Sequence, residues 1–581
     1  MCGIAGIVDY GLPGKANEER AGLLRAALRH RGPDGEGSYL GSHVALAHTR
    51  LAVIDRAGGA QPITSPDGRL TLVYNGEVYN YPELREELRP FWTFRTQGDG
   101  EVVLAAYAVW GRACLTRFNG MFAFFVWDEV RQSGFGARDG LGVKPFFYRL
   151  RGEFVFASEA KAILAIDTAR PSPNVEGIVE YLTAPCFSGV SRSMFAGIEP
   201  LPAGHCVTLD RQGPRVERWW DYVLAPDDAL PPRLLSLLDQ ATQRALRADD
   251  LPGIFLSGGL DSTALAALAA RRGHVPRCFS IRYADQDAFD YSRSAIVLSD
   301  DLPYALEAAN ELGLPCEVVD VSRRTLAEDL RALASIDDAL PAWEQELSQH
   351  YLARAAARHC KAVLVGDAAD ETHFGYHFLL DETATRSPRG IIDRFASPFL
   401  LGDPRDRFAR EYEQMCHEAG HSWETAESRL LATTYLIVKR WLARLLHNGD
   451  IHTMAFSLEG RVPFADTELL DLARRVPPAL GLANGIEKHA LRQSLRGILP
   501  EGVRLRRKSA LPKDQKAEEV YRREALQLVH EEGDFLGAFL DVPAIIAVCR
   551  RETPATERER AGLFQTICLA HWRRRYGVKT P

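Results

Sequence analysis

The second residue of the chain combines two groups that could do chemistry together. Cys2 follows Met1, and a small residue at this position permits removal of the initiator methionine. Cys2 would then carry a free α-amine beside its thiol, which places a base and a nucleophile on one residue, as in N-terminal-nucleophile catalysis. The α-amine has a pKa of about 8, so a useful fraction is neutral in the cell. The alternative is an ordinary buried cysteine in a first strand over 4–8.

A glycine-rich loop at residues 256–262 could bind phosphate groups. It reads Leu-Ser-Gly-Gly-Leu-Asp-Ser, and it lies between an apolar strand predicted over 251–257 and the start of a helix. Glycines let the backbone approach a phosphate, and a helix N-terminus offers unpaired N–H donors. Ser257 and Ser262 add hydroxyl donors, and Asp261 can hold Mg²⁺ against the phosphates. The loop lacks a Walker A Gly-Lys-Ser/Thr, and it resembles the Ser-Gly-Gly-x-Asp-Ser loop of ATP pyrophosphatases, which split ATP between the α- and β-phosphates.

Seven short segments in the first 161 residues carry the strongest resemblance. They read His-Arg-Gly-Pro-Asp-Gly (30–35), His-Thr-Arg-Leu-Ala-Val-Ile-Asp (48–55), Tyr-Asn-Gly-Glu-Val-Tyr-Asn (74–80), Thr-Gln-Gly-Asp-Gly-Glu (96–101), Asn-Gly-Met-Phe-Ala-Phe (119–124), Arg-Asp-Gly-Leu-Gly (138–142) and Ala-Ser-Glu-Ala-Lys (157–161). With Cys2, this ordered set resembles the class II, N-terminal-nucleophile glutamine amidotransferase domain over residues 2–210. The Met-Cys-Gly-Ile start and the downstream signatures are most similar to those of the asparagine synthetase family.

The resemblance implies a glutamine site around Cys2. Glutamine is zwitterionic, so Arg50 suits its carboxylate through a bidentate fork and Asp99 suits its ammonium. Asn75 and Gly76 would donate N–H groups to the oxyanion that forms when the thiol attacks. The implied glutamine-binding residues are Arg50, Asn75, Gly76, Glu77, Gly98 and Asp99, with Glu77 orienting the polar end of the substrate.

A second synthetase-like motif differs from the sequence that is typical of the family. Residues 364–376 read Leu-Val-Gly-Asp-Ala-Ala-Asp-Glu-Thr-His-Phe-Gly-Tyr, where asparagine synthetases typically show Ser-Gly-Glu-Gly-Ser/Ala-Asp-Glu. Asp370 matches, and the resemblance makes it a second Mg²⁺ ligand. Asp367 stands for a glutamate that the family uses at the acyl-adenylate and ammonia step, and Ala368 stands for a glycine. An aspartate is one methylene shorter, so it would reach a differently placed substrate.

Further signatures complete the implied ATP site. Glu-Gly-Arg-Val-Pro-Phe-Ala-Asp at 459–466 resembles a family motif, and Lys488 with Arg492 fits a Lys-x-x-x-Arg helix pattern. Lys508 matches the lysine that meets the departing pyrophosphate, where it would serve as a point cation. The implied ATP-binding residues are Leu256, Ser257, Gly258, Gly259, Asp261, Ser262, Ile281, Val365 and Gly366, with Asp261 and Asp370 as Mg²⁺ ligands and Asp367 and Lys508 as catalytic residues.

The pattern of predicted elements indicates two domains. Strands are grouped in the first 160 residues, which is typical of an α+β fold, and the resemblance makes it a four-layer αββα Ntn-hydrolase sandwich over 2–222. Proline and acidic residues predict a linker over 223–232. From 233 to 581, strands first alternate with helices, which predicts an α/β fold with a doubly wound parallel sheet of the PP-loop ATP-pyrophosphatase type and a helical C-terminal portion.

Composition agrees with a globular enzyme. The 581 residues are 46% hydrophobic and 25% charged, which excludes a disordered or fibrous chain. A formal net charge of −7 gives no reason to expect nucleic acid or an anionic membrane as a partner. We see neither a membrane-spanning run nor a signal peptide, so a cytoplasmic protein is expected. The ten cysteines form no C-x-x-C pair.

These expectations combine into one reaction. Cys2 would release ammonia from glutamine, an acceptor carboxylate would attack Mg-ATP to give an acyl-adenylate and pyrophosphate, and ammonia would displace AMP. The resemblance further implies an ammonia tunnel between the sites. The expected cofactors are ATP and Mg²⁺, with no bound organic cofactor, and the expected partners are glutamine, ATP and a carboxylic acid. Family members are often homodimers, while the sequence leaves the oligomeric state open.

The acceptor is the open question. Aspartate is favoured, which would make the chain an asparagine synthetase, and the alternative is another carboxylic acid of specialised metabolism. The segments 285–300 and 337–350 differ in sequence from the family. Acidic side chains there would repel a dicarboxylate or pair with an amine on the acceptor, and they include Asp337, Asp338, Glu344 and Glu346. A cyclising relative such as a β-lactam synthetase is disfavoured by Cys2, and a non-catalytic glutamine sensor by the intact phosphate loop.

Overall fold

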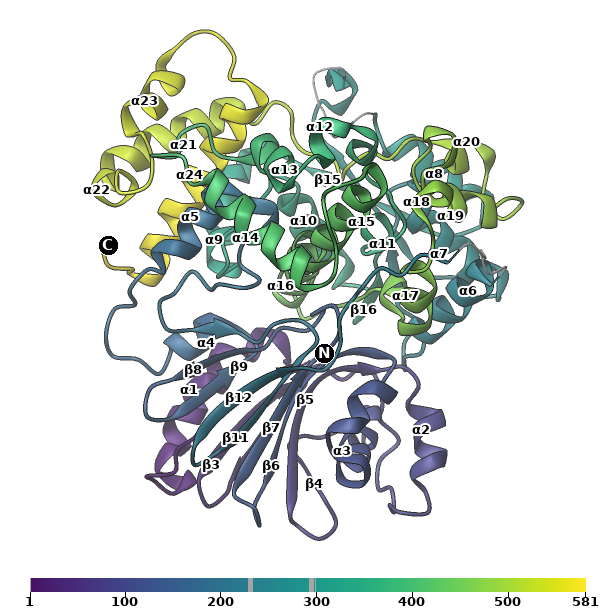
Figure 1. Cartoon of the computed structure of the whole chain (residues 1–581), viewed down its shortest axis with the longest axis vertical. Helices are drawn as coiled ribbons and strands as arrows, with labels where there is room; N and C mark the ends of the chain where they lie inside the picture. The colour runs from purple at the N-terminus through teal and green to yellow at the C-terminus, as the bar shows by residue number, and fades with distance from the viewer. Residues whose placement is uncertain (1, 228–232, 292–296, 298) are drawn as a thin grey trace.

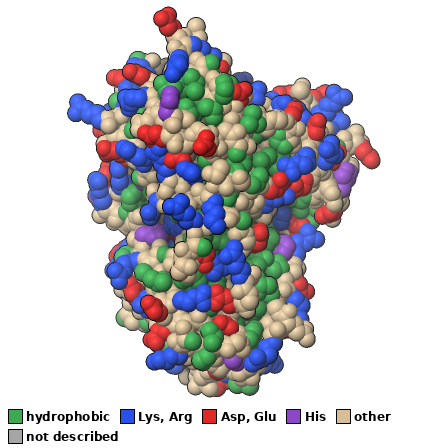
Figure 2. Space-filling view, turned by 90° about the vertical axis from the view of Figure 1, so that its left-hand side faces the viewer, with side chains coloured by type: hydrophobic (Ala, Val, Ile, Leu, Met, Phe, Trp, Pro, Cys, Tyr) green, Lys and Arg blue, Asp and Glu red, His purple; other side chains and the backbone are tan. Residues whose placement is uncertain are grey.

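The computed structural model describes residues 2–227, 233–291, 297 and 299–581. Figure 1 shows two bodies, a sandwich of sheets below and a mainly helical body above, and the start of the chain lies where they meet. Figure 2 shows positive and negative side chains intermingled over one face of the molecule. In this view the molecule is narrower between the two bodies. Among the described residues, no helix has the length and apolar character needed to cross a membrane.

The first domain contains two six-stranded antiparallel sheets. One has the order β10-β8-β9-β1-β3-β2 and the other β12-β11-β7-β6-β5-β4. The strands of the first are β1 (Cys2–Val8), β2 (Gly35–Leu40), β3 (Val44–Arg50), β8 (Phe147–Leu150), β9 (Phe154–Ala157) and β10 (Glu199–Pro200). Those of the second are β4 (Ile63–Thr64), β5 (Leu70–Val78), β6 (Gly120–Asp128), β7 (Ser133–Arg138), β11 (His205–Asp210) and β12 (Gly213–Arg218).

Helices cover the two outer faces of this sandwich. Along β1, Ile4 and Val8 pack between the sheets, whereas Ala5 and Ile7 pack towards the helices, because successive side chains of a strand point to opposite faces. The helices are α1 (Glu18–Ala27) and α4 (Ala160–Leu164) on one side and α2 (Tyr81–Leu88) and α3 (Asp99–Trp110) on the other (Figure 1). The predicted four-layer αββα arrangement is therefore confirmed.

The second domain is built on a parallel sheet with the order β15-β14-β13-β16-β17. Its strands are β13 (Gly253–Phe255), β14 (Cys278–Tyr283), β15 (Cys316–Val321), β16 (Ala362–Leu364) and β17 (Glu459–Arg461). The chain extends the sheet from β13 in one direction and from β16 in the other. The carboxyl ends of these two central strands therefore flank a switch point, the place where such sheets bind ligands, and the predicted doubly wound sheet is confirmed.

Helices make up most of the rest of this domain. Those among the strands are α6 (Leu234–Ala245), α7 (Leu260–Arg271), α8 (Leu302–Glu311), α9 (Leu326–Ile336), α10 (Glu346–Ala356) and α11 (Ala369–Thr372). The C-terminal portion includes α13 (Pro388–Phe395), α14 (Arg405–Glu418), α15 (Ala426–Leu436), α16 (Ala443–Met454), α17 (Thr467–Ala473), α19 (His489–Ser494), α21 (Glu518–Glu531), α23 (Val542–Arg550) and α24 (Glu557–Tyr576). A π-helical turn, Ile437–Leu442, joins α15 to α16 without a break.

The predicted linker over 223–232 is only partly described. Residues 228–232 lie outside the described residues. Residues 292–296 and 298 of the unusual segment 285–300 also lie outside them. The described part packs on the second domain, because the N–H groups of Ala225 and Asp227 donate to the carbonyls of Arg474 and Arg475, at 2.9 and 2.8 Å. The domain boundaries stay a prediction.

Two candidate active sites and the contacts between them

Strand β1 positions Cys2 at the edge of the sandwich that faces the second domain. In the register of the first sheet, Cys2 lies directly opposite Arg50, the last residue of β3. The main-chain nitrogen of Cys2 donates a hydrogen bond of 3.0 Å to Oδ1 of Asn75, which comes from the other sheet. Burial raises the pKa of the Cys2 thiol above its usual value. The thiol is therefore protonated at neutral pH and needs a base before it can attack.

Asn75 and Gly76 lie near the end of β5, where the sequence places the oxyanion donors. The side chain of Asn75 is fully buried, and its Nδ2 has no hydrogen-bond partner among the described residues. A buried N–H₂ without a partner is costly, so its presence beside a nucleophile indicates a donor kept for a ligand. A side chain at position 76 would meet the carbonyl oxygen of Met121 at 2.3 Å, so only glycine fits there.

The two ionic residues predicted to hold glutamine are fixed by their own surroundings. The guanidinium of Arg50 donates to the carbonyls of Asp55 and Arg56, at 2.5 and 2.9 Å. Asp99 opens α3 and accepts hydrogen bonds from the hydroxyl of Tyr74, at 2.6 Å, and the N–H of Val78, at 2.9 Å. Such contacts hold both charges in place before the substrate arrives, which lowers the cost of binding.

Gly98 and Glu77 complete the predicted set. Gly98 precedes α3, and its N–H donates to the carboxylate of Asp55 at 3.1 Å. Glu77 is buried and forms an ion pair of 3.1 Å with Arg461, a residue of β17 in the second domain. Burial raises the pKa of Glu77, although the positive charge of Arg461 opposes that shift. Glu77 therefore contacts the synthetase domain directly, a relation that the sequence did not indicate.

A second buried contact between the domains was also missed by sequence analysis. The guanidinium of Arg31 donates to the carbonyl of Cys2 at 3.1 Å, to Glu159 at 2.8 Å and to Asp450 of α16 at 2.8 Å. Lys144 lies 3.6 Å from the other oxygen of Asp450. Arg31 and Glu159 belong to recognisable sequence motifs. Nothing in those motifs indicates that Arg31 would contact Asp450, which lies several hundred residues away in the sequence.

In the second domain, the loop after β13 has the shape expected of a phosphate-binding loop. The hydroxyls of Ser257 and Ser262 lie 3.1 Å apart, and the N–H of Gly259 donates to Ser257 Oγ at 3.3 Å. Gly258 has φ +67°, and a side chain there would meet the backbone nitrogen of Ala305 at 2.4 Å. The loop can therefore adopt this tight turn only with glycine at position 258.

A cavity of about 930 Å³ opens beside this loop. Its size lies at the upper end of the usual range for small-molecule sites. Ten of the predicted residues line it, namely Leu256, Ser257, Asp261, Ser262, Ile281, Val365, Gly366, Asp367, Asp370 and Lys508. Gly258 and Gly259 shape the loop without being part of the lining. The carboxyl ends of β13, β14 and β16 thus bring together residues that are far apart in the sequence.

The two predicted metal ligands share one lysine. Lys488 Nζ lies 2.5 Å from Oδ2 of Asp261 and 2.6 Å from Oδ1 of Asp370, while Lys508 Nζ lies 2.6 Å from Oδ2 of Asp370. Asp261 Oδ1 is buried without a hydrogen-bond partner among the described residues. Two adjacent carboxylates with a spare oxygen suit Mg²⁺, which prefers oxygen ligands. The sequence suggested a basic helix face at Lys488 but not this bridging position.

Asp367 lies between two cavities. It lines the large cavity and also a small one, of about 20 Å³, whose walls include Val143 and Lys144 of the first domain and Gly449 of α16. The small cavity has room for about one water-sized molecule. Burial raises the pKa of Asp367 to about 6, with Lys508 opposing the shift and the carboxylates of Asp370 and Asp261 adding to it.

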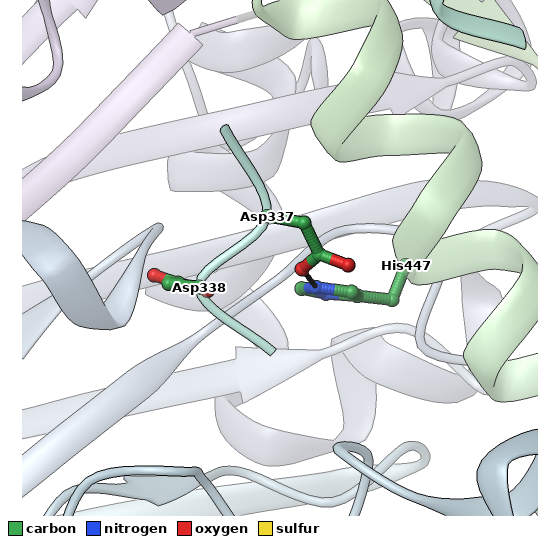
Figure 3. Close-up of side chains that lie close together, drawn as sticks. All are labelled: Asp337, Asp338 and His447. Atoms are coloured by element: carbon green, nitrogen blue, oxygen red, sulfur yellow. Dashed lines mark hydrogen bonds and ion pairs between the residues drawn. The ribbon is translucent and has the colours of Figure 1, made fainter. Parts of the chain in front are cut away.

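The four acidic residues at 337–350 are all engaged inside the protein. Asp337 forms ion pairs with Arg444, at 2.9 Å, and with His447, at 3.2 Å. Figure 3 shows its carboxylate pointing at the His447 ring, whereas the side chain of Asp338 points away from that pair. Asp338 accepts from the N–H of Lys161 at 2.8 Å.

The other two carboxylates have partners of the same kind. Glu346 pairs with His452, at 3.1 Å, and also accepts from the N–H of Ala342, at 2.6 Å. Glu344 pairs with Lys513 and Arg560, each at 2.8 Å. All four carboxylates therefore have partners inside the protein. Glu344 and Glu346 also line the large cavity, so the role considered for these residues from sequence stays a prediction.

Comparisons with known proteins agree with this two-site arrangement. Residues 1–220 match the family model of the glutamine amidotransferase domain, and residues 233–574 match that of asparagine synthase. The chain is 32% identical to glutamine-hydrolysing asparagine synthetase 3 of Bacillus subtilis, over 88% of this chain and 87% of that one. It is 28% identical to asparagine synthetase B of Escherichia coli, with coverage of 87% and 81%.

A fungal relative has a different name. The amidase chyE of Penicillium rubens is 26% identical and is matched over 100% of this chain and 99% of its own. The domain matches and the relatives agree with the resemblance drawn from the sequence. The chain belongs to the glutamine-hydrolysing asparagine synthetase family, and it is a ligase and glutamine-dependent amidotransferase of that type.

Proposed function

We propose that this enzyme uses ammonia from glutamine to convert a carboxylic acid into its amide, with ATP cleaved to AMP and pyrophosphate. The single observation that carries the proposal is the position of Asp367, which lines both the large cavity beside the phosphate loop and the small cavity at the domain interface. Ammonia that reached the small cavity would arrive at the place where an activated acyl group would wait.

In the first half-reaction, the Cys2 thiol transfers its proton to a base and attacks the side-chain carbonyl of glutamine. The proposed base is the α-amine of Cys2 after loss of Met1, a residue that lies outside the described residues. Asn75 Nδ2 and the backbone at Gly76 would stabilise the oxyanion. Ammonia leaves, and water hydrolyses the resulting glutamyl thioester to glutamate and free thiol. Arg50 and Asp99 would hold the two charged groups of the amino acid.

In the second half-reaction, an oxygen of the acceptor carboxylate attacks the α-phosphorus of ATP and pyrophosphate leaves. The phosphate loop and Lys508 would bind the phosphate groups, and Lys508 would stabilise the charge that develops on pyrophosphate. Asp261 and Asp370 would hold Mg²⁺, which neutralises phosphate charge when bound. Asp367 would take a proton from the nitrogen as ammonia attacks the acyl carbon and AMP departs.

Two acceptors remain candidates. The relatives named as asparagine synthetases support aspartate, while the amidase of Penicillium rubens, matched over the whole chain, supports another acid. Replacement of the family glutamate by Asp367 also favours a different acceptor, since Asp367 lines both cavities. Ala368, which stands for a glycine, is buried and lines neither cavity.

Acceptor-dependent exchange of radiolabelled pyrophosphate into ATP tests the proposal. We expect exchange that requires both Mg²⁺ and a carboxylic acid, and its loss in Asp261→Asn. Glutaminase activity of that variant should be retained, since Asp261 lies in the other domain. Exchange that needs no acid, or ATP cleavage to ADP and phosphate, would contradict the acyl-adenylate route.

A further inference from the structure

Five aromatic side chains form one wall of the large cavity, and we call them the aromatic wall. They are Trp343, Tyr376, Phe378, Phe395 and Trp441. Trp441 is the centre of the group. Its ring centroid lies 5.0 Å from that of Tyr376, 5.7 Å from Phe378, 5.9 Å from Trp343 and 5.2 Å from Phe395. The first three rings stack on Trp441 and the fourth meets it edge-on. Trp441 is only 7% exposed, so the four partly buried rings around it supply most of the apolar surface that lines the cavity.

One continuous helical segment connects the aromatic wall with the acyl site. Trp441, Leu445 and Asn448 recur at helical spacing, and all three line the cavity. The next residue, Gly449, is next to Asp367, since a side chain built there would lie 3.4 Å from Asp367 Oδ2. Seven residues separate Asn448 from Trp441, which corresponds to about 10 Å along the helix.

The helix is irregular at the aromatic end of this segment. Trp441 lies within the π-helical turn Ile437–Leu442. Such a turn inserts an extra residue into a helix and occurs often at functional sites. Here the π-helical turn changes the direction in which side chains point between α15 and α16. Trp441, which lies in the turn, lines the cavity together with Leu445 and Asn448 of α16.

Unpartnered polar atoms lie at the acyl end of the segment. Asn448 is only 1% exposed, yet neither Oδ1 nor Nδ2 of its amide has a hydrogen-bond partner among the described residues. Glu371 Oε2 is likewise buried and unpartnered, although the other carboxylate oxygen accepts from the hydroxyl of Tyr376. Buried polar groups are normally hydrogen-bonded, so these atoms indicate that a ligand completes the site.

Two of the cations that line the cavity near the aromatic wall, Arg394 and Lys513, are already paired, whereas Arg558 donates to the carbonyl of Ala396 and has no ion pair among the described residues. Arg394 forms an ion pair with Asp381, and Lys513 forms one of 2.8 Å with Glu344. A second carboxylate on the acceptor, such as the α-carboxylate of aspartate, would have to compete with these partners in order to bind Arg394 or Lys513. An acceptor that presents an apolar ring to this region faces no such competition.

We propose that the acceptor is an extended carboxylic acid with an aromatic ring, whose carboxylate lies between Asn448 and Asp367 and whose ring stacks on the aromatic wall. This inference rests on the proposed function, because it assigns the acceptor of the same reaction. Aspartate has only two carbon atoms between its two carboxylate groups, which is short beside the roughly 10 Å of helix between Asn448 and Trp441. With its reacting carboxylate at Asn448, it would end well short of Trp441 and leave the aromatic wall exposed to water.

The first test compares acids in pyrophosphate exchange with the complete enzyme and Mg-ATP. The probes are phenylacetate, 3-phenylpropanoate, 4-phenylbutanoate, hexanoate and aspartate. We expect kcat/KM for exchange to rise with spacer length among the phenyl acids. At least one phenyl acid should give a higher kcat/KM than both aspartate and hexanoate. Hexanoate serves as the comparison because it is extended but has no ring that could stack.

The second test uses matched tryptophan variants. Trp441→Leu keeps apolar bulk but removes the ring, so it should lower the ratio of kcat/KM for 4-phenylbutanoate to that for hexanoate by about 3- to 10-fold, the value of an aromatic pair. Trp441→Phe should restore most of the ratio. Trp423→Leu is the control, because Trp423 lies outside the cavity lining, before α15, and should leave the ratio unchanged. A ratio is insensitive to partial misfolding, which lowers both rates equally.

The outcomes separate the inference from the proposed function. If kcat/KM for exchange is higher with aspartate than with every phenyl acid, or if Trp441→Leu leaves the ratio of kcat/KM values unchanged, the proposal of an aromatic acceptor is wrong. The proposed amidation reaction would still stand. If no acid supports exchange although the enzyme hydrolyses glutamine, the proposed function and the inference both fail.

Discussion

Arg31 of the first domain and Asp450 of the second form an ion pair of 2.8 Å in which both side chains are almost completely removed from solvent. The same guanidinium donates to the carbonyl of Cys2, so the nucleophile is directly connected to α16. Helix α16 also carries Asn448 and Gly449, which line the two cavities on either side of Asp367. One helix of the synthetase domain is therefore linked through Arg31 to the residue of the proposed nucleophile, and it also lines the interface cavity and the proposed acyl site.

Removing the charge of Arg31 should weaken the domain interface. In Arg31→Leu, Lys144, at 3.6 Å, would be the one cation left beside Asp450 among the residues that the structure describes. Breaking a buried ion pair on one side costs about 3–5 kcal/mol, so we expect a lower midpoint in urea unfolding. We also expect more ammonia to escape per amide formed. Arg29→Ala is the control, since Arg29 pairs with Glu36 at the surface and should change neither quantity by much. Unchanged coupling in Arg31→Leu would contradict a role for this contact in ammonia transfer.

Replacing the nucleophile should separate the two half-reactions. Cys2→Ala is expected to lose glutamine-dependent amide synthesis by about three orders of magnitude or more, as in other enzymes that lose a nucleophile. Synthesis with added ammonium chloride should continue, because the ATP site lies in the other domain. Cys549→Ala, a half-buried cysteine of α23, provides the control. The measurement is amide formation with each nitrogen source, and retention of the glutamine-dependent rate in Cys2→Ala would show that another residue attacks.

Loss of the Asn75 side chain, whose Nδ2 has no hydrogen-bond partner among the described residues, should reduce the rate of the glutaminase step. Removing one oxyanion donor costs about 100- to 1000-fold in kcat. We expect Asn75→Ala to lower kcat by this amount with little change in KM for glutamine, because the donor acts on charge that develops only in the transition state. Steady-state glutaminase kinetics measure both constants. A change confined to KM would assign Asn75 to substrate binding instead.

Because Asp367 has a raised pKa, we expect the rate of amide synthesis from ammonia to depend on pH. Its pKa of about 6 is raised from an unfolded value of about 3.9, mainly by burial, so the base form appears as the pH rises through 6. Amide synthesis from ammonia, measured at a fixed concentration of NH₃, should rise over the same range. Asp367→Asn should lack this step and lose about 100-fold in rate, a typical contribution of a general base. Asp367→Glu restores a carboxylate, so no recovery in that variant would argue against proton transfer.

The raised pKa of Asp367 also predicts the sign of a stability change. The folded protein binds the proton more tightly than the unfolded chain between pH 4 and 6, so this residue makes the protein less stable as the pH rises through that window. Asp367→Asn should reduce that loss of stability. Unfolding midpoints in urea at pH 4.5 and 7 compare the two proteins, and an equal pH dependence would contradict the assigned shift.

Metal removal should affect only one half of the enzyme. Asp261 and Asp370 share Lys488, and we expect chelation by EDTA to abolish pyrophosphate exchange while glutamine hydrolysis continues. Readdition of Mg²⁺ should restore exchange. Asp370→Asn should need more Mg²⁺ for half-maximal exchange because one charged ligand is lost. Exchange that persists in EDTA would remove the metal from the mechanism.

Much of the candidate site was predictable because its signals are local. Cys2, Asn75 and Gly76, and the phosphate loop with Gly258 at φ +67°, are defined by turns and strand ends within a few residues. The family motifs also placed Asp370 and Lys508 in the predicted ATP site, and the structure brings the Lys508 Nζ and Asp370 Oδ2 atoms to 2.6 Å in the lining of one cavity. Lys488 was visible as part of a basic helix face, but its bridge between Asp261 and Asp370 was not.

The sequence alone was enough for the two fold classes and the family, and it predicted the two chemistries, because glycines, strand periodicity and motif order are encoded over short stretches. Only the tertiary structure decided how the two halves meet and what the acceptor cavity looks like. Arg31 and Asp450 are 419 positions apart, and the aromatic wall draws rings from four distant segments between Trp343 and Trp441. Contacts of this kind leave no local pattern, because they depend on packing that forms only when the whole chain has folded.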